Sequence, residues 1–204
     1  MPSKSRRQRA PAWLRDFLSI AVTLLVLLVA RASLADHYVV PSGSMQPTVH
    51  VGDRIFVNKA AFGVRVPLSD VWLGGQKLPA RGTVVVLDSP DDGPVLLKRV
   101  VAHPGDVVSV RGGRLILNGR EVKLTRVGGQ KLELLGHPHP ISLEHGGGPD
   151  FGPRRVPAGH LLVLGDNRGN SRDGRSFGFV KLEKLRGEAL GIYARDGRPG
   201  WWRL

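Results

Sequence analysis

The segment Pro41-Ser42-Gly43-Ser44-Met45 carries two hydroxyl groups on a backbone that proline and glycine bend. A serine hydroxyl is a poor nucleophile until a neighbouring base takes its proton. Histidine is the usual base, but none of the seven histidines lies in a G-x-S-x-G or other recognisable triad context. The chain has no cysteine, which excludes a thiolate nucleophile and Cys-ligated zinc. Another side chain has to be considered as the base.

Lysine is the alternative base. Lys98 and Arg99 lie inside an apolar strand pattern, where consecutive side chains point to opposite faces. A lysine on the apolar face loses hydration and its pKa falls, so that a neutral amine can deprotonate Ser44. A lysine on the solvent face would stay charged. The strand pattern alone leaves both alternatives open.

Two further polar groups follow later in the chain. The segment from Gly165 to Arg175 holds many turn formers and paired charges directly after an apolar strand, which indicates a hydrogen-bonded loop. His137, His139 and His145 cluster in a stretch rich in glycine and proline. A metal site and a solvated loop are the two interpretations of this histidine cluster.

Most of the chain after residue 50 has the pattern of short strands. Apolar runs predict strands at 51–57, 83–88, 95–103, 106–111, 161–164 and 188–194, and Asn118-Gly119 favours a hairpin between 115–117 and 121–124. Only 181–185 suggests a helix. We expect no core strand between about 128 and 157, where glycine and proline are frequent, but an inserted lobe or a flexible loop. The predicted fold is mainly β.

The N-terminal region pairs basic residues with an apolar run. Fourteen residues from Phe17 to Ala30 include only two polar side chains, and Arg31 then interrupts the run. The first sixteen residues hold five basic residues and one acidic residue, which predicts a cytoplasmic N-terminus and an exported remainder. The same pattern, with Ser33-Leu34-Ala35 before Asp36, also fits a cleavable signal peptide.

The formal net charge of +13 raises the question of an anionic partner. The basic residues after position 50 are dispersed rather than interleaved with aromatics, so we expect no nucleic-acid partner. The stretch 60–78 contains Phe62 and Trp72 among few charges. These side chains form either ordinary core or an apolar rim that contacts membrane lipid.

Four separated blocks together resemble bacterial type I signal peptidase, the membrane-bound Ser/Lys protease that removes signal peptides from exported proteins. Each block alone is weak, but four in family order behind an N-terminal apolar run are specific. The blocks are Pro41 to Thr48, Gly52 to Lys59, Lys98 to Val100 with Pro104 to Asp106, and Gly165 to Gly178.

The resemblance implies roles for individual residues. Ser44 would attack the scissile carbonyl, and Lys98 would act as general base and later protonate the leaving amine. The backbone N–H of Ser44 and the hydroxyl of Ser42 would form the oxyanion hole. Ser171 would orient the Lys98 amine, and the loop around it would be braced by Asp173, Arg175, Asp166 and Asn167. The residues expected to line shallow pockets for small substrate side chains are Val40, Pro41, Met45 and Leu97.

The resemblance also implies an architecture. We expect a signal-peptidase-like β core of antiparallel sheets with a small inserted lobe, preceded by one N-terminal transmembrane helix. The expected division is a basic tail and anchor at 1–36, a catalytic core at 37–105 and 159–204, and a lobe at 106–158. The chain would cross the bacterial inner membrane once, with its N-terminus cytoplasmic and its catalytic domain on the outer face.

The expected partners are signal peptides of secreted preproteins and membrane lipid, with no cofactor and no metal. Three loop positions depart from the commonest family pattern, and none of them removes a catalytic group; they are Gly169, Gly174 and Phe177. Two other functions remain open. One is a specialised Ser/Lys peptidase that matures one exported or conjugative protein, and the other is a membrane-tethered β module that only binds.

Overall fold

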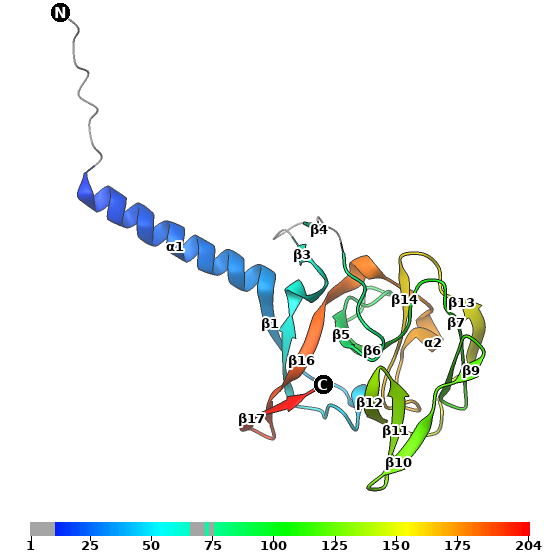
Figure 1. Ribbon diagram of the computed structural model, residues 1–204. Coiled ribbons are helices and arrows are strands. Elements are labelled where there is room, and N and C mark those ends of the chain that lie inside the picture. The colour runs from blue at the N-terminus through cyan, green and yellow to red at the C-terminus, as the bar shows by residue number, and fades with distance from the viewer. Residues whose placement is uncertain (1–10, 66–71, 74–75) are drawn as a thin grey trace, which may run out of the picture.

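The structure is a computed structural model that describes residues 11–65, 72–73 and 76–204. A long helix, α1 (Ala12–Leu34), projects from one end of a β domain and continues directly into the first strand (Figure 1). Among these described residues, no helix combines the length and the apolar character needed to cross a membrane.

The largest sheet has eight strands, and all of its pairings are antiparallel. Their order is β1-β2-β16-β5-β6-β14-β15, with β17 paired to β16. The strands are β1 (Ala35–Val39), β2 (Arg54–Asn58), β5 (Val84–Leu87), β6 (Leu96–Ala102), β14 (His160–Leu164), β15 (Val180–Lys181), β16 (Leu185–Arg195) and β17 (Arg198–Arg203). Each apolar run that predicted a strand here forms one, within a few residues of its expected bounds.

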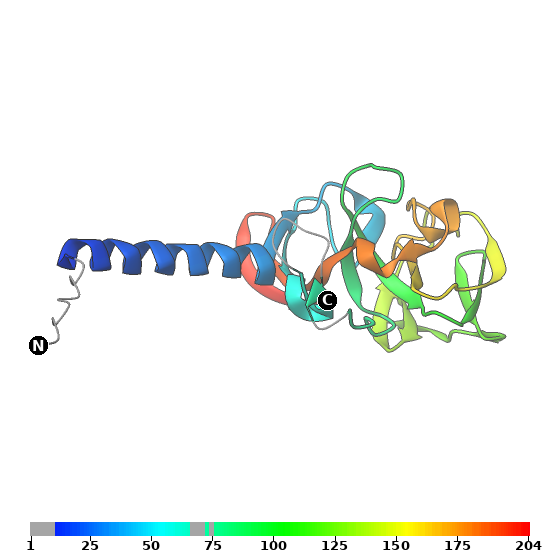
Figure 2. The same ribbon diagram turned by 90° about the horizontal axis from the view of Figure 1, so that it is seen from above.

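Two smaller sheets form from the chain between β6 and β14. One has the order β13-β7-β8-β9 and the other has the order β10-β11-β12. Their strands are β7 (Val107–Arg111), β8 (Arg114–Leu117), β9 (Arg120–Glu121), β10 (Leu124–Val127), β11 (Gln130–Leu135), β12 (His137–Ile141) and β13 (Phe151–Arg155). We call residues 107–155 the lobe. It lies at the end of the molecule away from α1 (Figure 2).

The remaining elements are short. Strands β3 (Val64–Arg65) and β4 (Trp72–Leu73) form a hairpin. Single helical turns are η1 (Gly43–Met45), η2 (Lys59–Phe62), α2 (Gly174–Phe177) and η3 (Leu182–Lys184). The last of these occupies the position at which the sequence suggested a short helix.

The stretch between about 128 and 157 adds no strand to the main sheet, as expected, but it is not a flexible loop. Strands β11, β12 and β13 all form there, although β12 contains Pro138 and Pro140. Both prolines are tolerated because β12 is an edge strand, and residues two apart direct their backbone nitrogens to the same side. Composition alone hid this strand because proline argues against a central strand and says nothing against an edge.

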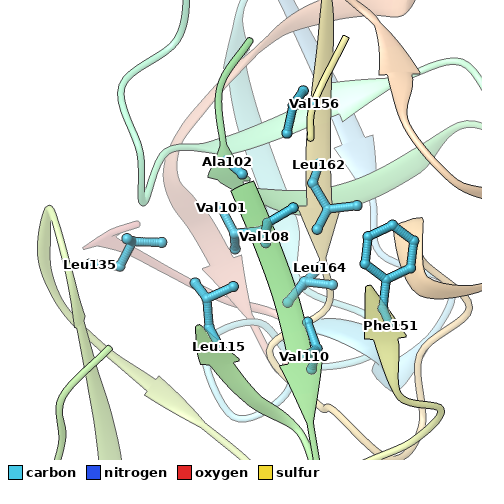
Figure 3. Close-up of a cluster of buried hydrophobic side chains, with 10 residues drawn as sticks. All are labelled: Val101, Ala102, Val108, Val110, Leu115, Leu135, Phe151, Val156, Leu162 and Leu164. Atoms are coloured by element: carbon cyan, nitrogen blue, oxygen red, sulfur yellow. The ribbon is translucent and has the colours of Figure 1, made fainter. Parts of the chain in front are cut away.

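A hydrophobic cluster joins the lobe to the main sheet. Side chains from β6 and β14 meet side chains from β7, β8 and β13 (Figure 3). Its members are Val101, Ala102, Val108, Val110, Leu115, Leu135, Phe151, Val156, Leu162 and Leu164. Burial of each valine or leucine contributes roughly 1.5–3 kcal/mol, so the cluster fixes the lobe against β6 and β14.

The position of Phe62 is inconsistent with one of the two interpretations of the 60–78 stretch, the apolar rim that contacts lipid. Its side chain is buried and packs with Val85, Leu87 and Val100 in the core, so it is no part of an exposed lipid-facing rim. An aromatic ring enclosed by aliphatic side chains already has its apolar surface removed from water. The side chain of Trp72, and residues Val66 to Val71, lie outside the described part of the chain.

Candidate active site

Ser44 and Lys98 meet at the centre of the site. Ser44 lies in η1, which is separated from the end of β1 by three residues, and Lys98 lies in the middle of β6. The Nζ atom of Lys98 is 2.7 Å from Oγ of Ser44 and also donates to the carbonyl oxygen of Leu97 at 2.9 Å. Only 3% of Lys98 is exposed, so it takes the apolar of the two faces that the sequence left open.

Burial changes the protonation of this amine. Desolvation lowers the pKa of Lys98 to about 8, against the opposing effect of the nearby carboxylates of Asp173 and Asp166. An amine with this pKa is neutral in roughly one molecule in ten at pH 7, compared with fewer than one in a thousand for an ordinary lysine. The geometry and the protonation together allow Lys98 to accept a proton from Ser44.

The neighbouring Arg99 points to the opposite face of β6 and holds the polar loop. Its guanidinium donates to both carboxylate oxygens of Asp166, from Nε at 2.8 Å and from Nη2 at 2.6 Å, and both side chains are buried. The hydroxyl of Thr48 also donates to Asp166. The sequence did not indicate Arg99 and Thr48 as site residues, because only the folded structure shows that both donate to the carboxylate of Asp166.

Asn167 connects the same loop to the nucleophile. Its backbone N–H donates to the carbonyl oxygen of Ser44 at 3.1 Å, and its side-chain amide donates to the carbonyl oxygen of Gly43 at 3.2 Å. These two bonds hold the turn that presents the Ser44 hydroxyl. A residue 123 positions later in the chain therefore helps to set the orientation of the serine.

Asp173 and Arg175 brace the end of the loop. The guanidinium of Arg175 donates to both oxygens of Asp173 at 2.8 Å, and both side chains are fully buried. Asp173 also accepts from the backbone N–H of Gly165 at 2.9 Å, at the start of the loop. Burial alone would raise the pKa of Asp173, but the hydrogen bond and charge of Arg175 lower it. The carboxylate therefore remains ionised beside Lys98.

Ser171, which the resemblance expects to orient the Lys98 amine, has a buried Oγ near the serine turn. The Lys98 amine bonds instead to Ser44 and Leu97, and Ser171 interacts with the carboxylate of Asp173. Gly165 separates Ser171 from Ser44, since a Cβ there would overlap Ser171 Oγ and lie 2.5 Å from the Ser44 carbonyl oxygen. Sequence reasoning missed this requirement for glycine.

An apolar pocket of about 270 Å³ opens beside the two catalytic candidates. Both Ser44 and Lys98 line it, and the exposed hydroxyl-bearing residue Ser42 forms part of its mouth. All four residues predicted to line the pocket do so, namely Val40, Pro41, Met45 and Leu97. Tyr38, Ile55 and Val86 also line it, from β1, β2 and β5. Only the last two strands were predicted from the sequence, and none of these three residues was expected in the pocket.

A buried ion pair links the lobe to the polar loop. Glu133 on β11 accepts from Arg168 at 2.9 and 2.6 Å, and both side chains are almost completely buried. Arg168 also donates to the carbonyl oxygen of Gly165 at 3.2 Å. Burial would raise the pKa of Glu133, but the charge of Arg168 lowers it to about 2. His139 contacts the same carboxylate at 3.3 Å, while His137 and His145 are exposed.

Comparisons with known proteins identify the family of this chain. The family profile described as "Signal peptidase, peptidase S26" matches residues 13–194, which is most of the chain. The chain belongs to this family. Signal peptidase I of Pseudomonas fluorescens is 37% identical over 200 residues, and the alignment covers 86% of this chain and 70% of that protein.

Other signal peptidases align over comparable lengths. Signal peptidase I of Pseudomonas aeruginosa is 37% identical over 175 residues, covering 79% of this chain and 62% of that protein. Signal peptidase I T of Bacillus subtilis is 30% identical over 193 residues, and the alignment covers 93% of this chain and 90% of that protein. A crystal structure of a signal peptidase I from Enterococcus faecalis covers 55% of this chain and 97% of its own, with 29% identity and a TM-score of 0.41.

Proposed function

We propose that this chain removes N-terminal signal peptides from exported preproteins, with Ser44 as nucleophile and Lys98 as general base. The observation that carries the proposal is the buried Lys98 amine at hydrogen-bond distance from the Ser44 hydroxyl, 2.7 Å. Membership in the signal peptidase family supplies the substrate class.

The reaction proceeds in two halves. Ser44 Oγ attacks the carbonyl carbon of the scissile bond while its proton moves to the neutral amine of Lys98. The backbone N–H of Ser44 and the hydroxyl of Ser42 stabilise the negative charge on the carbonyl oxygen. Lys98 then gives its proton to the leaving amine, which is the new N-terminus of the mature protein. Water, deprotonated by Lys98, hydrolyses the acyl-enzyme.

The apolar pocket determines where the chain is cut. Its volume of about 270 Å³ and its lining by aliphatic side chains such as Val40, Met45 and Leu97 suit small residues, as in an Ala-x-Ala site. An extended substrate adds along β1 by backbone hydrogen bonds and places alternate side chains into the pocket. Ser171, Asp166, Asn167, Asp173 and Arg175 act as supports of the dyad and its loop.

The enzyme works at a bacterial inner membrane, held by a single N-terminal anchor. Basic residues precede the predominantly apolar run from Phe17 to Ala30, which favours a cytoplasmic N-terminus and a catalytic domain outside. Three apolar side chains of α1, Trp13, Phe17 and Ile20, are each more than half exposed, which suits contact with lipid.

The chain divides into three regions with different roles. Residues 1–36 form the tail and anchor, 37–105 and 159–204 form the catalytic core, and 106–158 form the inserted lobe. The separate sheets within 107–155 support this division. The ion pair between Glu133 and Arg168 gives the lobe a means to support the polar loop of the core.

The test is cleavage of a preprotein that carries an Ala-x-Ala site by detergent-solubilised protein. We expect a single cut after the second alanine, and no cut when both alanines are replaced by leucine. The matched variant Ser44→Ala should remain folded and lose at least about a thousand-fold in rate, because the nucleophile is gone. Unchanged cleavage by Ser44→Ala would contradict the proposal.

A further inference from the structure

A second cavity, of about 400 Å³, lies beside the active-site turn and opens toward the lobe. We call it the lobe-side cavity. Its core wall includes Gln46, Pro47 and His50, and its lobe wall includes Gln130, Lys131 and Glu144. None of these six residues belongs to the proposed dyad, to its supporting loop or to the apolar pocket.

The lobe-side cavity is connected to the nucleophile through one residue, Asn167. Asn167 forms part of its wall, and the backbone N–H of Asn167 donates to the carbonyl oxygen of Ser44. Gln46 and Pro47 follow Ser44 by two and three residues. The apolar pocket includes the residues that precede Ser44, from Tyr38 to Ser42, none of which lines the lobe-side cavity. The two hollows therefore flank the same turn.

The path of the chain indicates which hollow an extended substrate would meet first. Strand β1 leads from the end of α1 to the turn that carries Ser44, and the apolar pocket lies along this strand. The lobe, which supplies one wall of the other cavity, lies at the end of the domain away from α1 (Figure 2). A substrate extended along β1, with its signal sequence near α1, continues past Ser44 toward the lobe.

The two hollows also differ in chemistry. Valine, leucine, isoleucine and methionine dominate the apolar pocket. The lobe-side cavity presents amide, imidazole, hydroxyl and charged groups, which come from Gln46, His50, Gln130, Lys131, Ser142, Glu144 and His145. Such a surface suits hydrogen bonding to a polar peptide rather than enclosure of an apolar side chain.

We propose that the lobe-side cavity binds the first residues of the mature protein, the polar peptide segment that directly follows the scissile bond. This inference rests on the proposed function and extends it to the second half of the substrate. An extended peptide advances about 3.3 Å per residue, so roughly three to six residues after the cut lie within reach of the cavity. The lobe then contributes to substrate recognition as well as to the fold.

The experiment compares two peptides that share one signal region and one Ala-x-Ala site. One peptide has two residues after the cut, and the other has eight polar residues. The full-length, detergent-solubilised enzyme is assayed as wild type, Lys131→Ala and His50→Ala. Lys123→Ala is the matched control, because Lys123 is an exposed lobe lysine that does not line the cavity.

We expect the wild type and Lys123→Ala to cut the longer peptide with a kcat/KM about three- to ten-fold higher than that for the shorter one. Lys131→Ala and His50→Ala should lose this length advantage, chiefly through KM, and should cut the shorter peptide as the wild type does. A length advantage that persists in both variants, or that is absent from the wild type, overturns the inference alone. Failure of the wild type to cut either peptide overturns the proposed function as well.

Discussion

The Nζ atom of Lys98 lies 2.7 Å from the Oγ atom of Ser44, and the lysine that provides it is buried on β6. A sheet interior is an unfavourable place for a lysine, because a charged amine loses its hydration there. Burial of Lys98 therefore lowers the stability of the fold but increases the fraction of neutral amine near pH 7. This effect on stability can be measured separately from catalysis.

Replacement of Lys98 by methionine should stabilise the fold at pH 7. The pKa of Lys98 is about 8 in the folded protein and 10.5 when unperturbed, so the unfolded chain binds more protons between these values. The cost of burial is therefore complete below about pH 8 and disappears above about pH 10.5. Urea unfolding of Lys98→Met should show a gain of up to about 3 kcal/mol at pH 7 that shrinks with rising pH. A loss of stability that does not depend on pH would contradict this account.

The Glu133–Arg168 pair should be far more important for stability than an exposed pair in the same lobe. Glu133→Gln keeps the shape but leaves the Arg168 charge buried without a partner, at a cost of about 3–5 kcal/mol in unfolding free energy. The matched control is Glu121→Gln, whose partner Arg114 is about half exposed, with an expected cost below about 1 kcal/mol. Equal effects in urea unfolding would show that the pair does not fix the lobe to the polar loop.

Gly165 should tolerate no side chain. A Cβ at this position would overlap Ser171 and lie 2.5 Å from the carbonyl oxygen of Ser44. Gly165→Ala must therefore displace the serine turn, and we expect kcat to fall at least ten-fold with a stability loss of about 1–3 kcal/mol. Gly93→Ala is the control, because its nearest neighbour would be Ser89 Oγ at 3.2 Å on an exposed turn. Similar kcat values for Gly165→Ala and Gly93→Ala would show that Gly165 is not needed to position the serine turn.

The sequence was most informative where function restricts residue type. The turn around Ser44, the strand around Lys98 and the polar loop are each continuous in sequence, so each segment could be recognised by itself. The resemblance then implied that Ser44 and Lys98 meet. The partners of Asp166 and Arg168 were not predictable in this way. Arg99 and Glu133 are 67 and 35 positions away from them, and nothing local marks either pairing.

Strand β12 shows a second limit of sequence reasoning. Its prolines indicated a loop, since proline removes a hydrogen-bond donor from any strand. Whether the segment forms a loop or an edge strand depends on whether a neighbouring strand, here β11, pairs with it on one side. That is a property of the assembled sheet. Likewise, Phe62 has the same local pattern whether it faces lipid or core, and only its packing against Val85 and Leu87 distinguishes the two.

The most direct test of the Ser44/Lys98 mechanism is the pH dependence of kcat/KM for a peptide with an Ala-x-Ala site. The active form is the neutral amine, so the rate should rise with pH through a midpoint of about 8 and then level off. Lys98→Met, which leaves Ser44 in place, should be inactive at every pH from 6 to 10. A wild-type profile that is flat over this range, or that falls with rising pH, would contradict a lysine base.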